Sequence, residues 1–366
     1  MPDDPRVTIR ELEWGSPLLD RQVSPELAAE ARRGGPVQGA AHFFGAVPWV
    51  YLAGARMNQR VLARVVLDHD LADLVGLVVS RDNSCRYCFA AQRALLRTVG
   101  FDEARILELE ETLLLAELPE ADRTALEFAQ RASRSSPLLS GLDVEPLRAV
   151  GFDDLAIKEL AVIAGLNLFF NRISTLAALP PKVWEELPDR WITRLTLPLG
   201  RRFVKRLRRR AEPASLRPEE RQGPFSQVVN ALDGHPFAGE LRRILDDMFA
   251  SQLVSRRAKA LCFGVVARAL GCALSEGEAR RVAEASGLSA GEVDHVLANL
   301  ASPELDETES LLVPFSRQTV WYQVPDLQRR SRELAGRLPR DVFLETLALV
   351  SLANVVCRLG FLAELE

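Results

Sequence analysis

Apolar residues recur at intervals of three and four along almost the whole of this 366-residue chain. Residues 71–79 illustrate the pattern, with Leu71, Leu74, Val75, Val78 and Val79 on one helical face. Long Val, Ile and Thr alternations bounded by tight turns are absent, as are the glycine patterns of P-loops and dinucleotide-binding sites. We therefore predict an all-α protein with helices of about 10–20 residues.

Length and composition predict two globular domains. At roughly 100–200 residues per domain, two is the default for this length. Apolar residues make up 48% of the chain and charged residues 26%, which excludes a wholly disordered protein. The start, MPDDPR, lacks the basic residues and apolar run of a signal peptide, and no stretch holds 18 uninterrupted apolar residues. We expect a cytoplasmic protein with mostly reduced cysteines.

Two parts of the chain fall outside the helical pattern. The first, residues 1–40, is predicted as an N-terminal arm. The second, residues 186–235, is rich in proline and is predicted as a basic linker with one or two amphipathic turns. Seven of its residues between 201 and 210 are Arg or Lys, and apolar side chains interleave with them over 195–210. A solvated or intersubunit-paired segment and contact with a membrane surface both stay open. No recognised motif accompanies the basic run, so we do not expect nucleic-acid binding.

The segments on either side of this linker resemble each other. Residues 159–172 read ELAVIAGLNLFFNR and residues 345–358 read ETLALVSLANVVCR, with both Glu and both Arg in register. Upstream, Asp73 and Cys85 are twelve apart, as are Ala260 and Cys272. This internal repeat predicts two tandem helical domains, over 41–185 and 236–366.

The feature that carries chemistry is a Cys-x-x-Cys pair, Cys85 and Cys88. Asn83 and Ser84 are good N-cap residues, so a helix is predicted to begin beside the pair. Residues three apart share a helix face, which brings the two thiols together. Unpaired N–H groups at a helix start favour negative charge, so we expect a lowered thiol pKa, with Arg86 adding to the effect.

The motif resembles the AhpD-like branch of the carboxymuconolactone decarboxylase superfamily, which are all-helical alkylhydroperoxidase-type proteins. The family pattern is Glu, eleven residues, Cys-x-x-Cys and a His four residues later. Asp73 stands here at the position of the Glu, one methylene shorter, and Gln92 at that of the His. The resemblance covers residues 45–185 well and 236–366 weakly.

The resemblance implies a mechanism. Cys88 would be the peroxidatic cysteine and Cys85 the resolving, partner-facing one, with a redox-active disulfide between them and no bound cofactor. Gln92 cannot relay a proton, so another group must compensate. His69 is the best local candidate, and His42 is a second.

The second half is predicted to be inactive. Cys272 matches the first cysteine of the motif, but Ser275 and Ala279 occupy the positions of the second cysteine and of the family His. A lone thiol cannot close the same disulfide. Cys262 and Cys357 are expected to be core cysteines.

The cysteine pair and its surroundings have other interpretations. Zinc would need two more ligands, and no second Cys or His pair exists, so no metal is expected. Inert buried cysteines are also open. Asn167 and Asn171 form either a structural network with Arg172 or, in the case of Asn171, part of the thiol pocket, where Tyr87 is also placed.

The leading prediction is a thiol-dependent hydroperoxide reductase or thiol–disulfide oxidoreductase. Its partners would be a small hydroperoxide and a reducing thiol protein or dithiol. The resemblance further implies a homo-oligomer, a trimer or a dimer. The alternative is a catalytically degenerate family member that serves as a scaffold or binding protein.

Overall fold

A computed structural model describes residues 9–33, 39–61, 63–111, 117–134, 137–186 and 191–365. The all-α prediction is confirmed, since 71% of the chain is helical. Within the described residues the only strands are β1 (Ala63–Arg64) and β2 (Arg209–Arg210), which pair in parallel.

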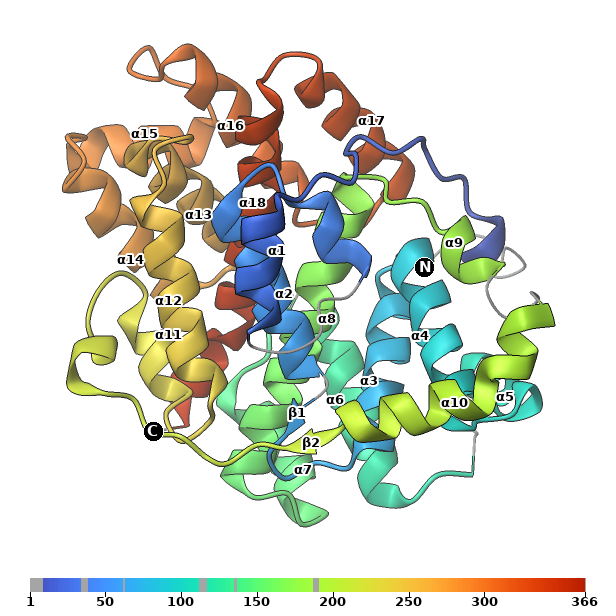
Figure 1. Cartoon of the computed structure of the whole chain (residues 1–366). Coiled ribbons are helices and arrows are strands. Elements are labelled where there is room, and N and C mark those ends of the chain that lie inside the picture. Colours follow the sequence, from blue (N-terminus) through green and yellow to red (C-terminus); the bar gives the residue numbers. More distant parts are fainter. Residues whose placement is uncertain are drawn as a thin grey trace.

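The helices fall into two series with a connecting region (Figure 1). The first series is α2 (Pro48–Val61), α3 (His69–Asp82), α4 (Arg86–Val99), α5 (Glu103–Glu111), α6 (Glu120–Ser133), α7 (Glu145–Ala149) and α8 (Asp154–Leu176). The second series is α12 (Phe237–Ala250), α13 (Arg256–Leu270), α14 (Ala273–Glu284), α15 (Ala290–Asn299), α16 (Glu307–Gln318), α17 (Val324–Ala335) and α18 (Arg340–Leu359). The N-terminal arm holds α1 (Pro25–Arg32), and the connecting region holds α9 (Lys182–Glu185), α10 (Trp191–Leu207) and α11 (Ser226–Ala231).

The two series correspond in order and spacing. One constant interval separates the first residues of α3, α4, α5 and α6 from those of α13, α14, α15 and α16, respectively. The interval between the starts of α8 and α18 is shorter by a single position. This agreement is what the internal repeat leads one to expect, although the duplication itself stays a prediction.

The core is built around α8 and α18, which lie side by side near the centre of the molecule (Figure 1). Gly165 allows the close approach, because a Cβ there would lie 3.3 Å from Val355. Helix α18 with the turn that follows it (340–364) is apolar and long enough to cross a membrane, but 94% of its apolar window is buried inside the protein. That burial fits the core helix of a soluble protein.

Two buried arginines join the halves in a reciprocal way. Arg172 of α8 donates hydrogen bonds to the carbonyls of Thr319 and Val320, just after α16. Arg358 of α18 donates one to the carbonyl of Ala132 near the end of α6, at 3.0 Å. Each half therefore supplies a guanidinium to carbonyls at the end of a helix in the other half.

The connecting region is more regular than predicted. Instead of isolated turns it forms the 17-residue helix α10, which packs against α4 (Figure 1). Part of the basic run is bound within the chain, since Arg208 pairs with Asp70 at 2.9 Å and with Asp73 at 2.5 Å. Leu199 and Phe203 remain 65% and 58% exposed. The side chains of residues 195–197 in the suggested membrane-facing segment lie outside the described part.

The N-terminal arm lies across both halves. The N–H of Gly15 donates to Gln328 of α17 at 2.8 Å, and Asp20 pairs with Arg340 at 3.2 Å. The N–H of Leu18 donates to the carbonyl of Ala177, at the end of α8.

Candidate active site

The cysteine pair lies at the tight turn between α3 and α4. The N–H of Cys85 donates to the carbonyl of Ser80 at 3.0 Å, and Ser84 adopts a positive φ of 50° that reverses the chain. The predicted cap positions are one or two residues too early. Asn83 ends α3, and Cys85 itself is the N-cap of α4.

The predicted proximity of the two cysteines is confirmed. The residues approach to 2.9 Å, and the N–H of Cys88 donates to Sγ of Cys85 at 3.3 Å. Both are free thiols. Cys85 is fully buried and Cys88 is 7% exposed. Only Cys88 therefore offers any surface to a small molecule, whereas a resolving Cys85 was expected to face a partner.

The expected lowering of the thiol pKa is wrong for Cys88. Burial raises the pKa of Cys88 well above its usual value, and the hydrogen bond with Cys85 raises it further, while Ser174 opposes the shift. Desolvation outweighs the helix start here. Arg86 does not add to the site's positive charge, because it pairs with Glu185 at 2.6 Å.

Sequence reasoning missed Tyr322, in the loop between α16 and α17. Burial raises its pKa, and the neighbouring Cys85 and Cys88 raise it further. Its hydroxyl is buried, as is that of Thr175 at the end of α8, and neither has a hydrogen-bond partner among the described residues. The Arg172 guanidinium lies 4.6 Å from the centre of the Tyr322 ring. A residue of the second half thus lies near the cysteines of the first.

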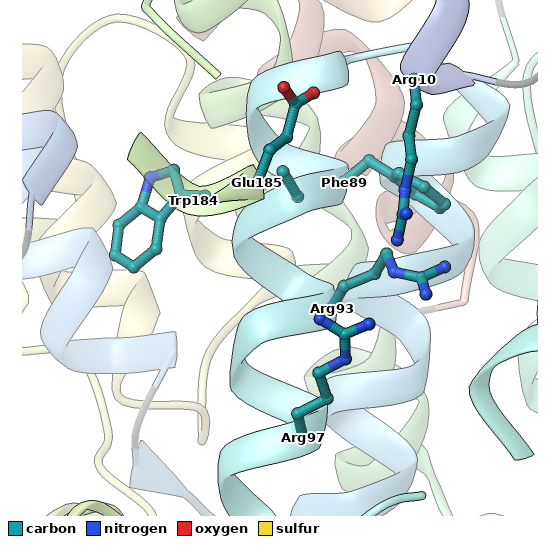
Figure 2. A pocket seen from close by; sticks show the side chains of 7 residues that line it. Arg10, Phe89, Arg93, Arg97, Trp184 and Glu185 are labelled. Atoms are coloured by element: carbon teal, nitrogen blue, oxygen red, sulfur yellow. The ribbon is translucent and has the colours of Figure 1, made fainter. Parts of the chain in front are cut away.

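Tyr87, which the sequence analysis placed in the thiol pocket, lies close enough to both cysteines for them to affect its pKa. It packs edge-on against Trp184 with ring centres 6.4 Å apart, and burial raises its pKa to about 12. Trp184 also borders a surface pocket of about 130 Å³ on the outer side of α4. Figure 2 shows Arg10, Arg93 and Arg97 gathered at this pocket. Arg93 is neutralised there by ion pairs with carboxylates of α5, and the cysteines do not line it.

Gln92 faces an amide rather than a thiol. Its Nε2 donates to Oδ1 of Asn167 at 3.1 Å, and its Oε1 is buried without a hydrogen-bond partner among the described residues. Gly76 of α3 makes room for it, since a Cβ there would lie 2.7 Å from Nε2. Asn171 accepts a hydrogen bond from Ser80 at 3.2 Å. The amides therefore join α8 to α3 and α4 and do not form the suggested network with Arg172.

Asp73 is held away from a catalytic relay. Besides Arg208 at 2.5 Å, it faces Arg64 at 4.0 Å. Burial raises the pKa of Asp73, and the two arginines oppose that shift. Within the described residues its ion pairs are with these guanidinium groups and not with the Gln92 region.

The two candidate histidines lie in other surroundings. His69 begins α3, and Asn83 ends it, so His69 and the cysteines are roughly 20 Å apart along the helix axis. Burial and then Arg64 lower the pKa of His69 to about 4. His42 packs near Tyr51, with ring centres 6.4 Å apart. His69 is therefore too far from the cysteines to supply the missing base.

Cys272 has a neighbouring thiol that the sequence pattern does not reveal, because Cys357 of α18 affects its pKa. Cys262 and Cys357 are both buried in the core, as expected. Cys262 is fully buried, and burial raises its pKa to about 12.

The described residues contain no group of three or more His, Cys, Asp or Glu side chains that could hold a metal ion. The sequence matches no protein-family model, and no curated protein matches it significantly.

Proposed function

We propose that this protein is a thiol-dependent hydroperoxide reductase or thiol–disulfide oxidoreductase of the AhpD-like type, working through Cys85 and Cys88. The observation that carries the proposal is the close approach of two free cysteines at the start of α4, where the N–H of Cys88 donates to Sγ of Cys85 and Cys88 is the less deeply buried of the two. Paired thiols at a helix start that can close a disulfide are the arrangement of two-cysteine redox proteins.

The pair supplies a proton acceptor of its own in place of the family histidine. Cys85 is the hydrogen-bond acceptor at the N-cap, and Cys88 is the donor. Once the pair has lost one proton to solvent, Cys85 can take the thiol proton of Cys88 and leave the negative charge on the more exposed cysteine. Burial is the main cause of the raised pKa of Cys88, and the hydrogen bond with Cys85 adds to it.

The reaction balances with this pair alone. The Cys88 thiolate attacks the O–O bond of the hydroperoxide, forming a sulfenic acid, and the departing alkoxide takes the proton from Cys85 to become an alcohol. The Cys85 thiolate then attacks the sulfenic sulfur. A disulfide forms, and hydroxide leaves and is protonated by solvent to water. The hydroperoxide gains two electrons, and an external dithiol restores the thiols by exchange.

A scaffold or binding protein is the second candidate, and one observation favours it. Asp73 is ion-paired to Arg208 and Arg64, and Gln92 is bonded to Asn167, so the positions of the family relay serve structure here. In either role we propose a cytoplasmic homo-oligomer that arose by tandem duplication. The shared helix spacing and the reciprocal arginines support the duplication.

Thiol counting with disulfide mapping tests the proposal. One equivalent of hydroperoxide should remove two thiols from the Cys272→Ser protein, in which the other thiol pair cannot compete, and non-reducing peptide mapping should find Cys85 joined to Cys88. In this background Cys88→Ser should abolish turnover, whereas Cys85→Ser should leave a trappable sulfenic acid on Cys88. Cys262→Ala, in a remote core position, is the matched control and should keep full activity. If the Cys85 and Cys88 thiols survive peroxide and the protein still binds a partner, the scaffold function replaces the enzyme.

A further inference from the structure

A second pair of thiols meets in the other half of the molecule. Cys272 is the residue before α14, where Gly271 has turned the chain with a φ of 75° at the end of α13. Cys357 lies in the last turn of α18. The two residues are far apart in sequence, yet α14 and α18 contact each other, and a Cβ at Gly360, one turn after Cys357, would lie 3.3 Å from Sγ of Cys272. Each cysteine also affects the pKa of the other.

This pair differs from the first in how it is built. Cys272 follows Cys85 at the same interval at which α14 follows α4, and at that interval Cys88 is replaced by Ser275. Cys357 follows Asn171 at the interval at which α18 follows α8. The second cysteine of this pair therefore lies on the long central helix α18, whereas that of the first pair lies on the shorter helix α4. Both sites hold two sulfurs.

The surroundings shift the pKa values of the two thiols in opposite directions. The hydrogen bond from Cys357 lowers the pKa of Cys272 to about 6, although burial opposes this shift. Burial raises the pKa of Cys357 well above its usual value, as does the neighbouring Cys272. Ser275 is fully buried beside both sulfurs and favours the charged form of each. The lowered pKa favours the thiolate form of Cys272 at a helix start, with the Cys357 thiol as its neighbour.

Cys272 is also the more accessible of the two cysteines to a small molecule. Cys272 is 7% exposed and Cys357 is 1% exposed. Gly360 leaves room beside Cys272, because a Cβ there would lie 3.3 Å from its Sγ. Cys262 in the same half is different, because it is fully buried and its pKa is raised to about 12, as expected for an inert cysteine.

We propose that Cys272 and Cys357 form a second dithiol centre, which a hydroperoxide oxidises to a disulfide that ties α14 to α18. The Cys272 thiolate attacks the peroxide O–O bond, and an alcohol leaves after protonation by solvent. The resulting sulfenic acid condenses with Cys357, whose thiol proton leaves with the hydroxide as water. The peroxide gains the two electrons that the two thiols lose. This inference goes beyond the proposed function, because it does not require Cys85 and Cys88 to turn over.

The test uses the full-length Cys85→Ser/Cys88→Ser protein, which keeps three thiols, at positions 262, 272 and 357. One equivalent of hydrogen peroxide should remove two of the three thiols. Non-reducing peptide mapping should recover a peptide that joins Cys272 to Cys357 within one chain. Adding Cys357→Ser should replace the disulfide by a sulfenic acid on Cys272 that a dione reagent traps.

The outcomes separate this centre from the first. Three intact thiols after peroxide treatment overturn the inference, as does a loss in which Cys262 reacts as fast as Cys272. A disulfide between chains overturns it as well. Because the first pair is absent from the test protein, failure of the Cys85–Cys88 enzyme in the wild type leaves this result unaffected.

Discussion

Glu159 provides a sharp test of how α3 is held in place. This fully buried carboxylate of α8 accepts hydrogen bonds from three successive backbone N–H groups, those of Val65, Val66 and Leu67, at 2.5, 2.7 and 2.7 Å. These residues lead directly into α3. In Glu159→Gln one acceptor oxygen becomes an NH₂ donor that faces N–H groups.

The magnitude follows from the number of bonds lost. A hydrogen bond to a charged group contributes about 1.5–3 kcal/mol, so losing one or two predicts a decrease of about 2–5 kcal/mol in the free energy of unfolding. Equilibrium urea unfolding followed by circular dichroism measures it. Glu284→Gln, on the exposed face of α14, is the matched control and should change stability by less than about 0.5 kcal/mol. If Glu159→Gln is as stable as this control, the three bonds do not hold the segment, and the argument from buried donors is wrong.

Three further predictions concern the relay, acid stability and the basic helix. Gln92→His alone should change peroxide turnover little, because Arg208 holds Asp73. Adding Arg208→Ala should raise turnover by about 10-fold, less than the roughly 10²–10⁴-fold of general acid–base catalysis because Asp73 is one methylene short, and equal rates for the single and double variants would contradict this account. Burial lowers the pKa of His235 to about 3, so its neutral ring stabilises the fold above pH 6.5, and this contribution is lost as pH falls. Wild-type stability should fall relative to His235→Asn by up to about 1.4 kcal/mol per pH unit between 6.5 and 3, whereas parallel curves would refute the linkage. If α10 contacts membranes, Phe203→Asp should weaken binding to anionic vesicles about 10-fold without unfolding the protein, and a wild type that ignores such vesicles removes the membrane hypothesis.

Local features of the fold could be predicted because neighbouring residues determine them. Helical periodicity predicted the fold class. Gly100 ends α4 in the left-handed conformation with a φ of 114°, which is typical of a glycine that follows a helical run. The three-residue spacing of Cys85 and Cys88 was enough to place them together, because a helix start needs no distant partner.

The rest depends on contacts between distant parts of the chain. Tyr322 lies near cysteines that belong to the other half of the sequence, and no periodic pattern in the sequence predicts that proximity. Arg208 reaches Asp73 across 135 residues. The thiol pKa was misjudged for the same reason. A helix start contributes about 0.3–1 kcal/mol, whereas burial, which sequence spacing does not reveal, can shift a pKa by several units.

The arm that joins both halves has a consequence for biosynthesis. Gly15 emerges from the ribosome 313 residues before Gln328, the side chain that its N–H contacts. At about 5–20 residues per second, the arm waits roughly 15–60 s for this partner. Trp14 and Leu18, which pack on the finished core, have no docking surface from the second half during that interval. The arm therefore completes its contacts only after the second half is made, and its apolar side chains are accessible to chaperones during that interval.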